Sequence, residues 1–167
     1  IPTTLRPMNL LLRATFALAC FVAATSLPAA EAPYAVGDRF AGLVTKDQHD
    51  KPFTYAGGAR LVVVSFEMDT GKAANGFLEQ KGAAYLDSQR ALFIANIHGM
   101  PGIARAFAMP KMRKYPHRIL LADGEDFLAR YPSKDNHLTV LQLDGQDKIT
   151  AIRFVPKKEA AAAFAAP

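Results

Sequence analysis

The feature that most constrains the fold is a series of short apolar runs that alternate with segments patterned as helices. Residues 59–66 (ARLVVVSF) and 92–97 (LFIANI) are continuous apolar runs of the kind found in strands buried on both faces of a sheet. A third run, residues 117–121 (HRILL), predicts another strand. Between the runs, residues 73–86 and 101–110 have apolar positions near helical spacing. This alternation predicts a partly parallel sheet with helices on both faces.

Turn signals at both ends of the series predict antiparallel hairpins. The first is expected over residues 36–55, with its turn at Asp47–Asp50. The second joins two strands around a turn at Asp144–Asp147. Its strands are expected at residues 138–143 and 149–155. A short helix is expected at residues 125–130, and a last helix at residues 157–166.

Two residues are expected to interrupt the longer helices. Gly82 is a weak point in the helix over residues 73–86. Pro101 suits the first turn of the next helix, whereas Pro110 is expected to end or kink it. Ile103, Ala106 and Phe107 lie between these prolines.

Residues 1–30 have the three parts of a secretion signal. Arg13 gives a basic start, residues 14–24 form a short apolar core, and residues 26–30 (SLPAA) give a small-residue exit. Because the apolar core is too short for a stable membrane span, we expect cleavage rather than a retained anchor. The residues before Met8 are interpreted as a mis-start. We therefore expect an exported domain over residues 31–167, either periplasmic or secreted, with no stable membrane span.

Cys20 is the only cysteine of the 167 residues, and it lies inside the predicted signal peptide. Lipid attachment at Cys20 is disfavoured because the apolar core continues past it. A mature chain without Cys20 would have neither a disulfide nor a thiolate nucleophile. Removing residues 1–30 also takes away Arg6, Arg13 and no acid, so the formal net charge of +5 becomes +3. This modest excess does not indicate a nucleic-acid partner.

The ordered segments resemble the thioredoxin-like superfamily, in the branch that contains peroxiredoxins and exported thiol-disulfide reductases. The resemblance implies one domain over residues 31–167, a three-layer α/β/α sandwich with a mixed central sheet and an N-terminal β-hairpin. The segments that carry it are Gly37–Phe40 with Asp47–Pro52, Leu61–Phe66, Leu120–Gly124 with Tyr131, and Thr139–Gly145.

The sequence departs from this family where the family has its active site. Thr70 and Ala73 stand where the family has two cysteines at the start of its first long helix, and His137 stands where it has a cis-proline. The resemblance therefore implies a redox-silent binding or accessory module, with a protein partner and no catalytic residue. A different hypothesis, an oxidoreductase-related protein with a recruited cofactor, has no direct support in the residues.

The same helix start offers a candidate anion or partner site, formed by Asp69, Thr70, Gly71 and Lys72. Free backbone N–H groups at a helix N-terminus, with a lysine beside them, can bind an anion. The alternative, which we favour, is an ordinary N-cap in which Asp69 or Thr70 satisfies those donors.

Thioether and imidazole side chains suggest a second candidate site, for Cu(I), at His98, Met100, Met109 and Met112. This would make the protein a periplasmic copper metallochaperone. The alternative is that the methionines fill the core.

A basic cluster around the second helix is interpreted as a solvated face, with docking of an acidic partner or a phospholipid surface as the alternative. Its members are Arg105, Lys111, Arg113, Lys114 and Arg118.

Overall fold

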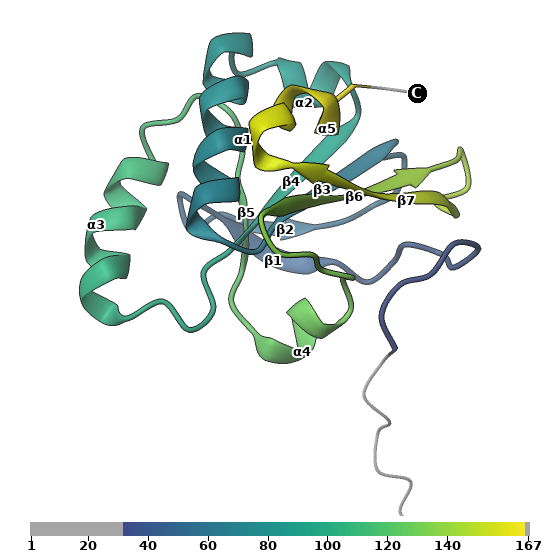
Figure 1. The fold of residues 1–167 in the computed structure, drawn as a ribbon, viewed down its shortest axis with the longest axis horizontal. Helices are drawn as coiled ribbons and strands as arrows, with labels where there is room; N and C mark the ends of the chain where they lie inside the picture. Colours follow the sequence, from purple (N-terminus) through teal and green to yellow (C-terminus); the bar gives the residue numbers. More distant parts are fainter. Residues whose placement is uncertain (1–31, 166–167) are drawn as a thin grey trace, which may run out of the picture.

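The computed structural model describes residues 32–165, which form a seven-stranded mixed sheet with helices packed against it (Figure 1). The strand order is β2-β1-β5-β4-β3-β6-β7. β4 pairs in parallel with β3 and with β5, and all other neighbours are antiparallel. The predicted mixed sheet and N-terminal hairpin are confirmed. The strands are β1 (Val44–Asp47), β2 (Pro52–Thr54), β3 (Leu61–Ser65), β4 (Ala91–Asn96), β5 (Leu120–Ala122), β6 (His137–Leu143) and β7 (Ile149–Pro156).

The crossovers from β3 to β4 and from β4 to β5 run in the same direction along the sheet. With right-handed crossovers, their helices α1 and α3 lie over the same face. Figure 1 shows α2 and α5 beside α1, and α4 over the opposite face. The helices are α1 (Met68–Lys81), α2 (Tyr85–Ser88), α3 (Gly102–Met112), α4 (Glu125–Ala129), the 3₁₀ turn η1 (Lys157–Glu159) and α5 (Ala160–Ala163).

Each face of the sheet has its own apolar core, which confirms the three-layer arrangement. On the α1 face, Leu78 and Phe164 pack with Phe93 and other strand residues. On the α4 face, the chain before β1 covers the sheet with Tyr34 and Phe40, and these rings contact Tyr131. The strand residues between the cores alternate, so Val62 faces one core and Val63 the other.

The first long helix differs from its predicted bounds. α1 begins at Met68 instead of residue 73, and it ends at Lys81. Gly82 follows with φ 84°, a conformation that glycine adopts without strain, and α2 is a separate short helix. The weak point at Gly82 is thus a true helix end.

Three further boundaries differ from prediction. Pro110 lies inside α3, which continues to Met112. The missing N–H leaves the carbonyl of Ala106 on the exposed side of the helix, where solvent can pair with it. β5 begins at Leu120, and His117 precedes it as a buried loop residue. The last predicted helix is short, formed by η1 and α5.

The predicted signal peptide, with Cys20, lies outside the described residues. Within residues 32–165, no helix has the length and apolar character needed to cross a membrane.

Candidate functional site

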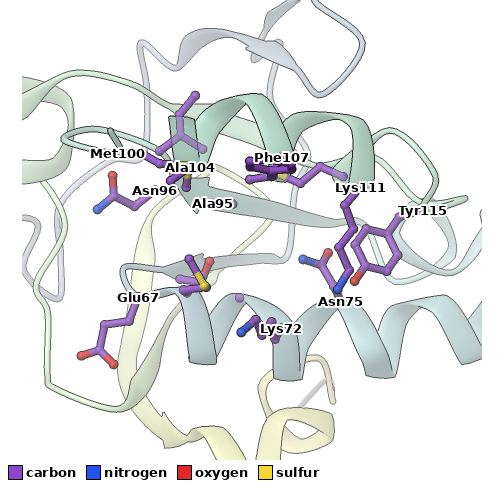
Figure 2. Close-up of a pocket in the computed structure, with 16 residues that line it drawn as sticks. Glu67, Lys72, Asn75, Ala95, Asn96, Met100, Ala104, Phe107, Lys111 and Tyr115 are labelled. Atoms are coloured by element: carbon purple, nitrogen blue, oxygen red, sulfur yellow. The ribbon is translucent and has the colours of Figure 1, made fainter. Parts of the chain in front are cut away.

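A groove of about 330 Å³ lies between α1 and α3, and we call it the α1–α3 groove (Figure 2). Its floor is formed where β3 and β4 end, at Ser65, Ala95 and Ile97. The groove therefore lies at the carboxyl ends of the parallel strands, the edge at which open α/β sheets bind ligands. The lining is mostly apolar.

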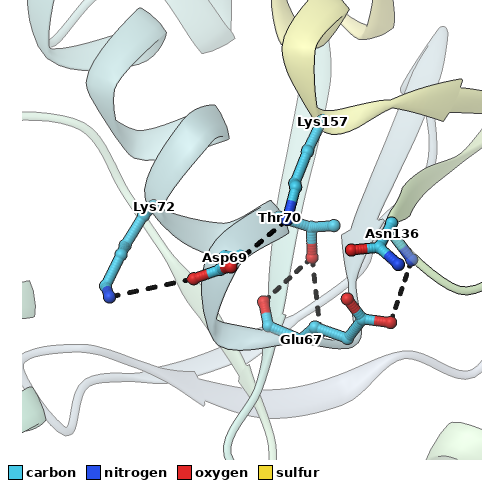
Figure 3. A network of polar contacts seen from close by, with 6 residues as sticks. All are labelled: Glu67, Asp69, Thr70, Lys72, Asn136 and Lys157. Carbon is cyan, nitrogen blue, oxygen red and sulfur yellow. Dashed lines mark hydrogen bonds and ion pairs between the residues drawn. The ribbon is translucent and has the colours of Figure 1, made fainter.

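The α1 wall of the groove begins at a capped helix end. Glu67 is the N-cap, and its side chain accepts a hydrogen bond from the backbone N–H of Thr70 in a capping box. In return, the Thr70 hydroxyl accepts from the Glu67 N–H (3.3 Å) and donates to the Glu67 carbonyl (2.9 Å; Figure 3). Thr70 is fully buried, so its hydroxyl is a structural group with no access to a substrate.

Glu67 also ties the helix start to the loop before β6. Its Oε1 accepts a hydrogen bond of 3.0 Å from the backbone N–H of Asn136 (Figure 3). His137 then begins β6, and its Nδ1 lies 2.6 Å from the carbonyl oxygen of Asp135. No peptide bond in residues 32–165 is cis. This is the loop in which the resemblance implies a cis-proline opposite the two cysteines. In this chain the Glu67 carboxylate binds the loop through Asn136.

The four residues of the predicted anion site diverge in the structure. Glu67 caps the helix, so the prediction that Asp69 or Thr70 is the cap was wrong. The Asp69 carboxylate lies 3.2 Å from Lys157 and 3.9 Å from Lys72 (Figure 3). Only Gly71 and Lys72 of the set line the groove.

Ala73, at the second predicted cysteine position, is partly buried against the core. Thr70 and Ala73 both lie in α1, and neither residue lines the groove.

The α3 wall is held differently. All of its described residues are at least partly exposed, and Ile103 and Phe107 are 79% and 78% exposed. Near its start, Arg105 donates to the carbonyl of Ile97 (3.1 Å) and to Asp123 (2.6 Å). Arg113, which follows the last residue of α3, likewise donates to one backbone carbonyl and one carboxylate.

The two bonds of Arg113 go to the carbonyl of Gln48 (2.9 Å) and to the carboxylate of Asp50 (2.7 Å). Three of the five residues in the predicted basic cluster have such contacts, since Arg118 also lies over the ring of Phe53 at 5.7 Å. Lys111 and Lys114 remain, and only Lys111 lines the groove.

The predicted copper ligands do not come together as a set of four. Met100 and Met112 line the groove, whereas Met109 packs against the core and His98 is exposed outside the groove. Met68, which the predicted set left out, lines the groove as well. Within residues 32–165 no group of three or more His, Cys, Asp or Glu side chains could hold a metal ion.

Polar groups lie at both ends of the groove, Glu67 and Asn96 at one end and Asn75, Lys111 and Tyr115 at the other (Figure 2). Lys111 reaches from α3 toward Asn75 of α1, and Tyr115 lies beside them. Burial, with a smaller contribution from Glu79, raises the pKa of Tyr115, so its hydroxyl stays protonated at neutral pH. Lys72 lines the groove from α1.

A buried pair beneath the Asn75 end was missed by sequence reasoning. His117 is 1% exposed, and its Nε2 lies 2.8 Å from Oδ1 of Asn75. Burial lowers the pKa of His117 to about 4, so the ring is neutral at physiological pH. The two residues lie 42 positions apart, so no local sequence pattern indicates their contact.

No family model and no curated protein matches this sequence. Solved structures do match. One is a putative protein disulfide isomerase from Bacteroides thetaiotaomicron, with a TM-score of 0.50 and 17% identity over 77% of this chain and 84% of that chain. A second is the thioredoxin domain of a thiol-disulfide oxidoreductase from Bacteroides vulgatus, with a TM-score of 0.52 and 14% identity over 77% and 95%.

A third is a peroxidoxin from Mycobacterium tuberculosis, with a TM-score of 0.50 and 15% identity over 77% of this chain and 95% of that chain. At these identities the likeness shows the fold alone. The strand order, the two-sided core and these neighbours together establish that the chain has the thioredoxin-like fold.

Proposed function

We propose that this chain is a redox-silent thioredoxin-like binding module that uses the α1–α3 groove as its binding site. The observation that carries the proposal is a mostly apolar groove beside a helix start whose thiol positions hold Thr70 and Ala73. The similar structures are named as a thiol-disulfide oxidoreductase, a putative protein disulfide isomerase and a peroxidoxin, and thiol-disulfide exchange in general requires a thiolate. Residues 32–165 contain no cysteine, so the fold lacks that group where the helix dipole would activate it.

The secretion-signal pattern of residues 1–30 supports an exported location, periplasmic or secreted, as part of the same proposal. The expected protein partner stays a prediction.

Redox silence is tested with purified protein in an insulin-reduction assay and a hydroperoxide-consumption assay. We expect no turnover above buffer in either assay, because no thiol stands at the start of α1. Turnover that disappears in a Cys20→Ser variant would overturn the proposal.

Use of the groove is tested with 8-anilinonaphthalene-1-sulfonate, a fluorescent apolar probe. Ala104 lines the groove and Ala106 lies on the exposed side of the same helix, so they form a matched pair. We expect Ala104→Trp to abolish probe binding by filling the groove, and Ala106→Trp to leave it unchanged. Equal binding by both variants would remove the groove from the proposal.

One observation favours a second candidate, a copper(I) carrier. Met68, Met100 and Met112 line the same groove, and three thioethers suit Cu(I). This set keeps Met100 and Met112 of the predicted set, adds Met68, and leaves out His98 and Met109. Competition against a Cu(I) chelator tests this candidate. Wild-type protein should retain the ion, and a Met100→Leu/Met112→Leu variant should lose it. If both proteins lose the ion equally to the chelator, the copper hypothesis is wrong.

A further inference from the structure

We infer that the α1–α3 groove binds a small amphipathic anion, an apolar body ending in a carboxylate, which Lys72, Lys111 and the side-chain amide of Asn75 would hold. This inference rests on the proposed function, because it names the chemistry of the ligand for the same groove.

The size and lining of the groove fit the apolar part of such a ligand. Its volume of about 330 Å³ lies at the lower end of the ~300–1,000 Å³ typical of small-molecule sites. Ala104, Phe107, Ala108 and Met112 follow one another at helical spacing on α3 and line one wall. Small alanines between larger apolar residues leave room for a ligand.

The side chains near Asn75 and Lys111 give this part of the groove a positive charge. Lys72 and Asn75 are three residues apart on α1, so they share one face of the helix. Lys111 approaches Asn75 from the opposite wall (Figure 2). Within residues 32–165 the Lys111 side chain makes no ion pair or hydrogen bond, so its ammonium is available to a ligand.

The nearby acids have other partners. The Glu67 carboxylate accepts from the backbone of Thr70 and Asn136, and it lies at the end of the groove away from Lys111 (Figure 2). Asp69 does not line the groove, and its nearer partner is Lys157 at 3.2 Å rather than Lys72 at 3.9 Å. An incoming carboxylate would therefore meet cations and not a competing anion.

Asn75 supplies the most specific part of the site. It is 6% exposed and lines the groove. Its Oδ1 contacts Nε2 of His117, and the other ring nitrogen, Nδ1, is buried without a partner among the described residues. An orphaned acceptor costs less than an orphaned N–H, so Nε2 carries the proton and donates to Oδ1.

This hydrogen bond fixes the orientation of the amide. With Oδ1 directed at His117, the Nδ2 amino group of Asn75 is left for the groove, and it has no hydrogen-bond partner within residues 32–165. This amino group faces the open groove that Lys72 and Lys111 also line, so a carboxylate bound there would accept hydrogen bonds from all three side chains.

The test compares three probes of one shape by isothermal titration calorimetry: octanoate, 1-octanol and octylammonium. We expect octanoate to bind most tightly and octylammonium most weakly. In Lys72→Gln/Lys111→Gln, octanoate affinity should fall about tenfold, the loss expected for two partly exposed charge pairs, while octanol affinity stays unchanged. Lys114→Gln, which removes an exposed charge outside the groove, should behave as wild type.

The outcomes separate the inference from the proposed function. If octanol binds as tightly as octanoate and Ala104→Trp abolishes both, the groove is a binding site and the anion inference is wrong. If none of the three octyl probes binds, and the fluorescent probe binds Ala104→Trp as it binds wild type, both the anion inference and the proposed function are wrong. Self-association through Ile103 and Phe107, seen by analytical ultracentrifugation with no octanoate binding, would assign the groove to a second copy and overturn the inference.

Discussion

α1 and α3 follow neighbouring parallel strands and lie over the same face of the sheet, yet they are held to it in opposite ways. α1 buries Thr70, Gly71, Ala74, Asn75 and Leu78, whereas every described residue of α3 is at least partly exposed. α1 is fixed along its length by packing, while α3 is tied near its ends by Arg105 and Arg113.

This difference explains why a groove exists at all. A helix with a buried stripe closes the space between itself and the sheet, because side chains in a core pack to high density. A helix that is tied near its ends by arginines, and that packs against the core only through partly buried side chains such as Met109 and Met112, can leave space between itself and the sheet. Topology alone therefore does not decide whether the crevice beyond β3 and β4 is filled or open.

Truncation within α1 should give the largest effect on stability. Leu78 is fully buried against the strands, so Leu78→Ala removes apolar contacts and leaves a cavity. We expect the free energy of unfolding, measured by urea denaturation, to fall by about 2–5 kcal/mol. A loss below about 1 kcal/mol would mean that α1 is no better packed than α3.

Acidification should destabilise the α1 side next, through His117. Its pKa of about 4 in the folded protein lies below the ordinary 6.5, so the unfolded chain binds the proton more tightly. The stabilising contribution of the neutral ring is complete above pH 6.5 and is lost as the pH falls toward 4, on the order of 3 kcal/mol in all.

Urea denaturation at several pH values, compared with His117→Gln, measures this contribution. The glutamine can still donate to Asn75 but does not titrate, so its stability should depend less on pH between 6.5 and 4. Identical pH profiles for the two proteins would show that another group causes the acid sensitivity.

Loosening the ties of α3 should have a smaller and more local effect. Arg113→Met removes bonds to Gln48 and Asp50 on a largely exposed side chain, and we expect a cost of about 1 kcal/mol. Amide hydrogen exchange should then speed up about fivefold in α3 and stay unchanged in α1. Lys114→Met is the control, and a comparable change in it would argue against a specific tie.

The smallest effect is expected at Phe107. Its ring is 78% exposed, so Phe107→Ala should change the free energy of unfolding by less than about 0.5 kcal/mol. The same variant should weaken probe binding, because Phe107 lines the groove. A large loss of stability would show that α3 is packed like α1, which would contradict the comparison.

The fold could be predicted because its signals are local. Continuous apolar runs gave β3 and β4, and the turns at Asp47–Asp50 and Asp144–Asp147 gave both hairpins. The start of α1 was missed because its N-cap is Glu67, and glutamate is not among the residues preferred at that position.

The site could be predicted only in part, because its remaining signals are not local. Thr70 and Ala73 mark the right helix, but Asn75 is recognisable only through its contact with His117. Ile103 and Phe107 have the spacing of a packed helix, and only the tertiary structure leaves them exposed. The sequence predicts a solvated basic face for Arg105 and Arg113. In the structure, Arg105 pairs with Asp123 and Arg113 with Asp50.

The most direct test of the account is an NMR titration of ¹⁵N-labelled protein with octanoate. If the unpacked space beside α3 receives ligands, chemical-shift changes should concentrate on residues of the two facing walls, led by Gly71, Lys72, Ala104 and Ala108. Changes centred instead on the opposite face, around Tyr34 and Tyr131, or an unchanged spectrum at saturating octanoate, would contradict it.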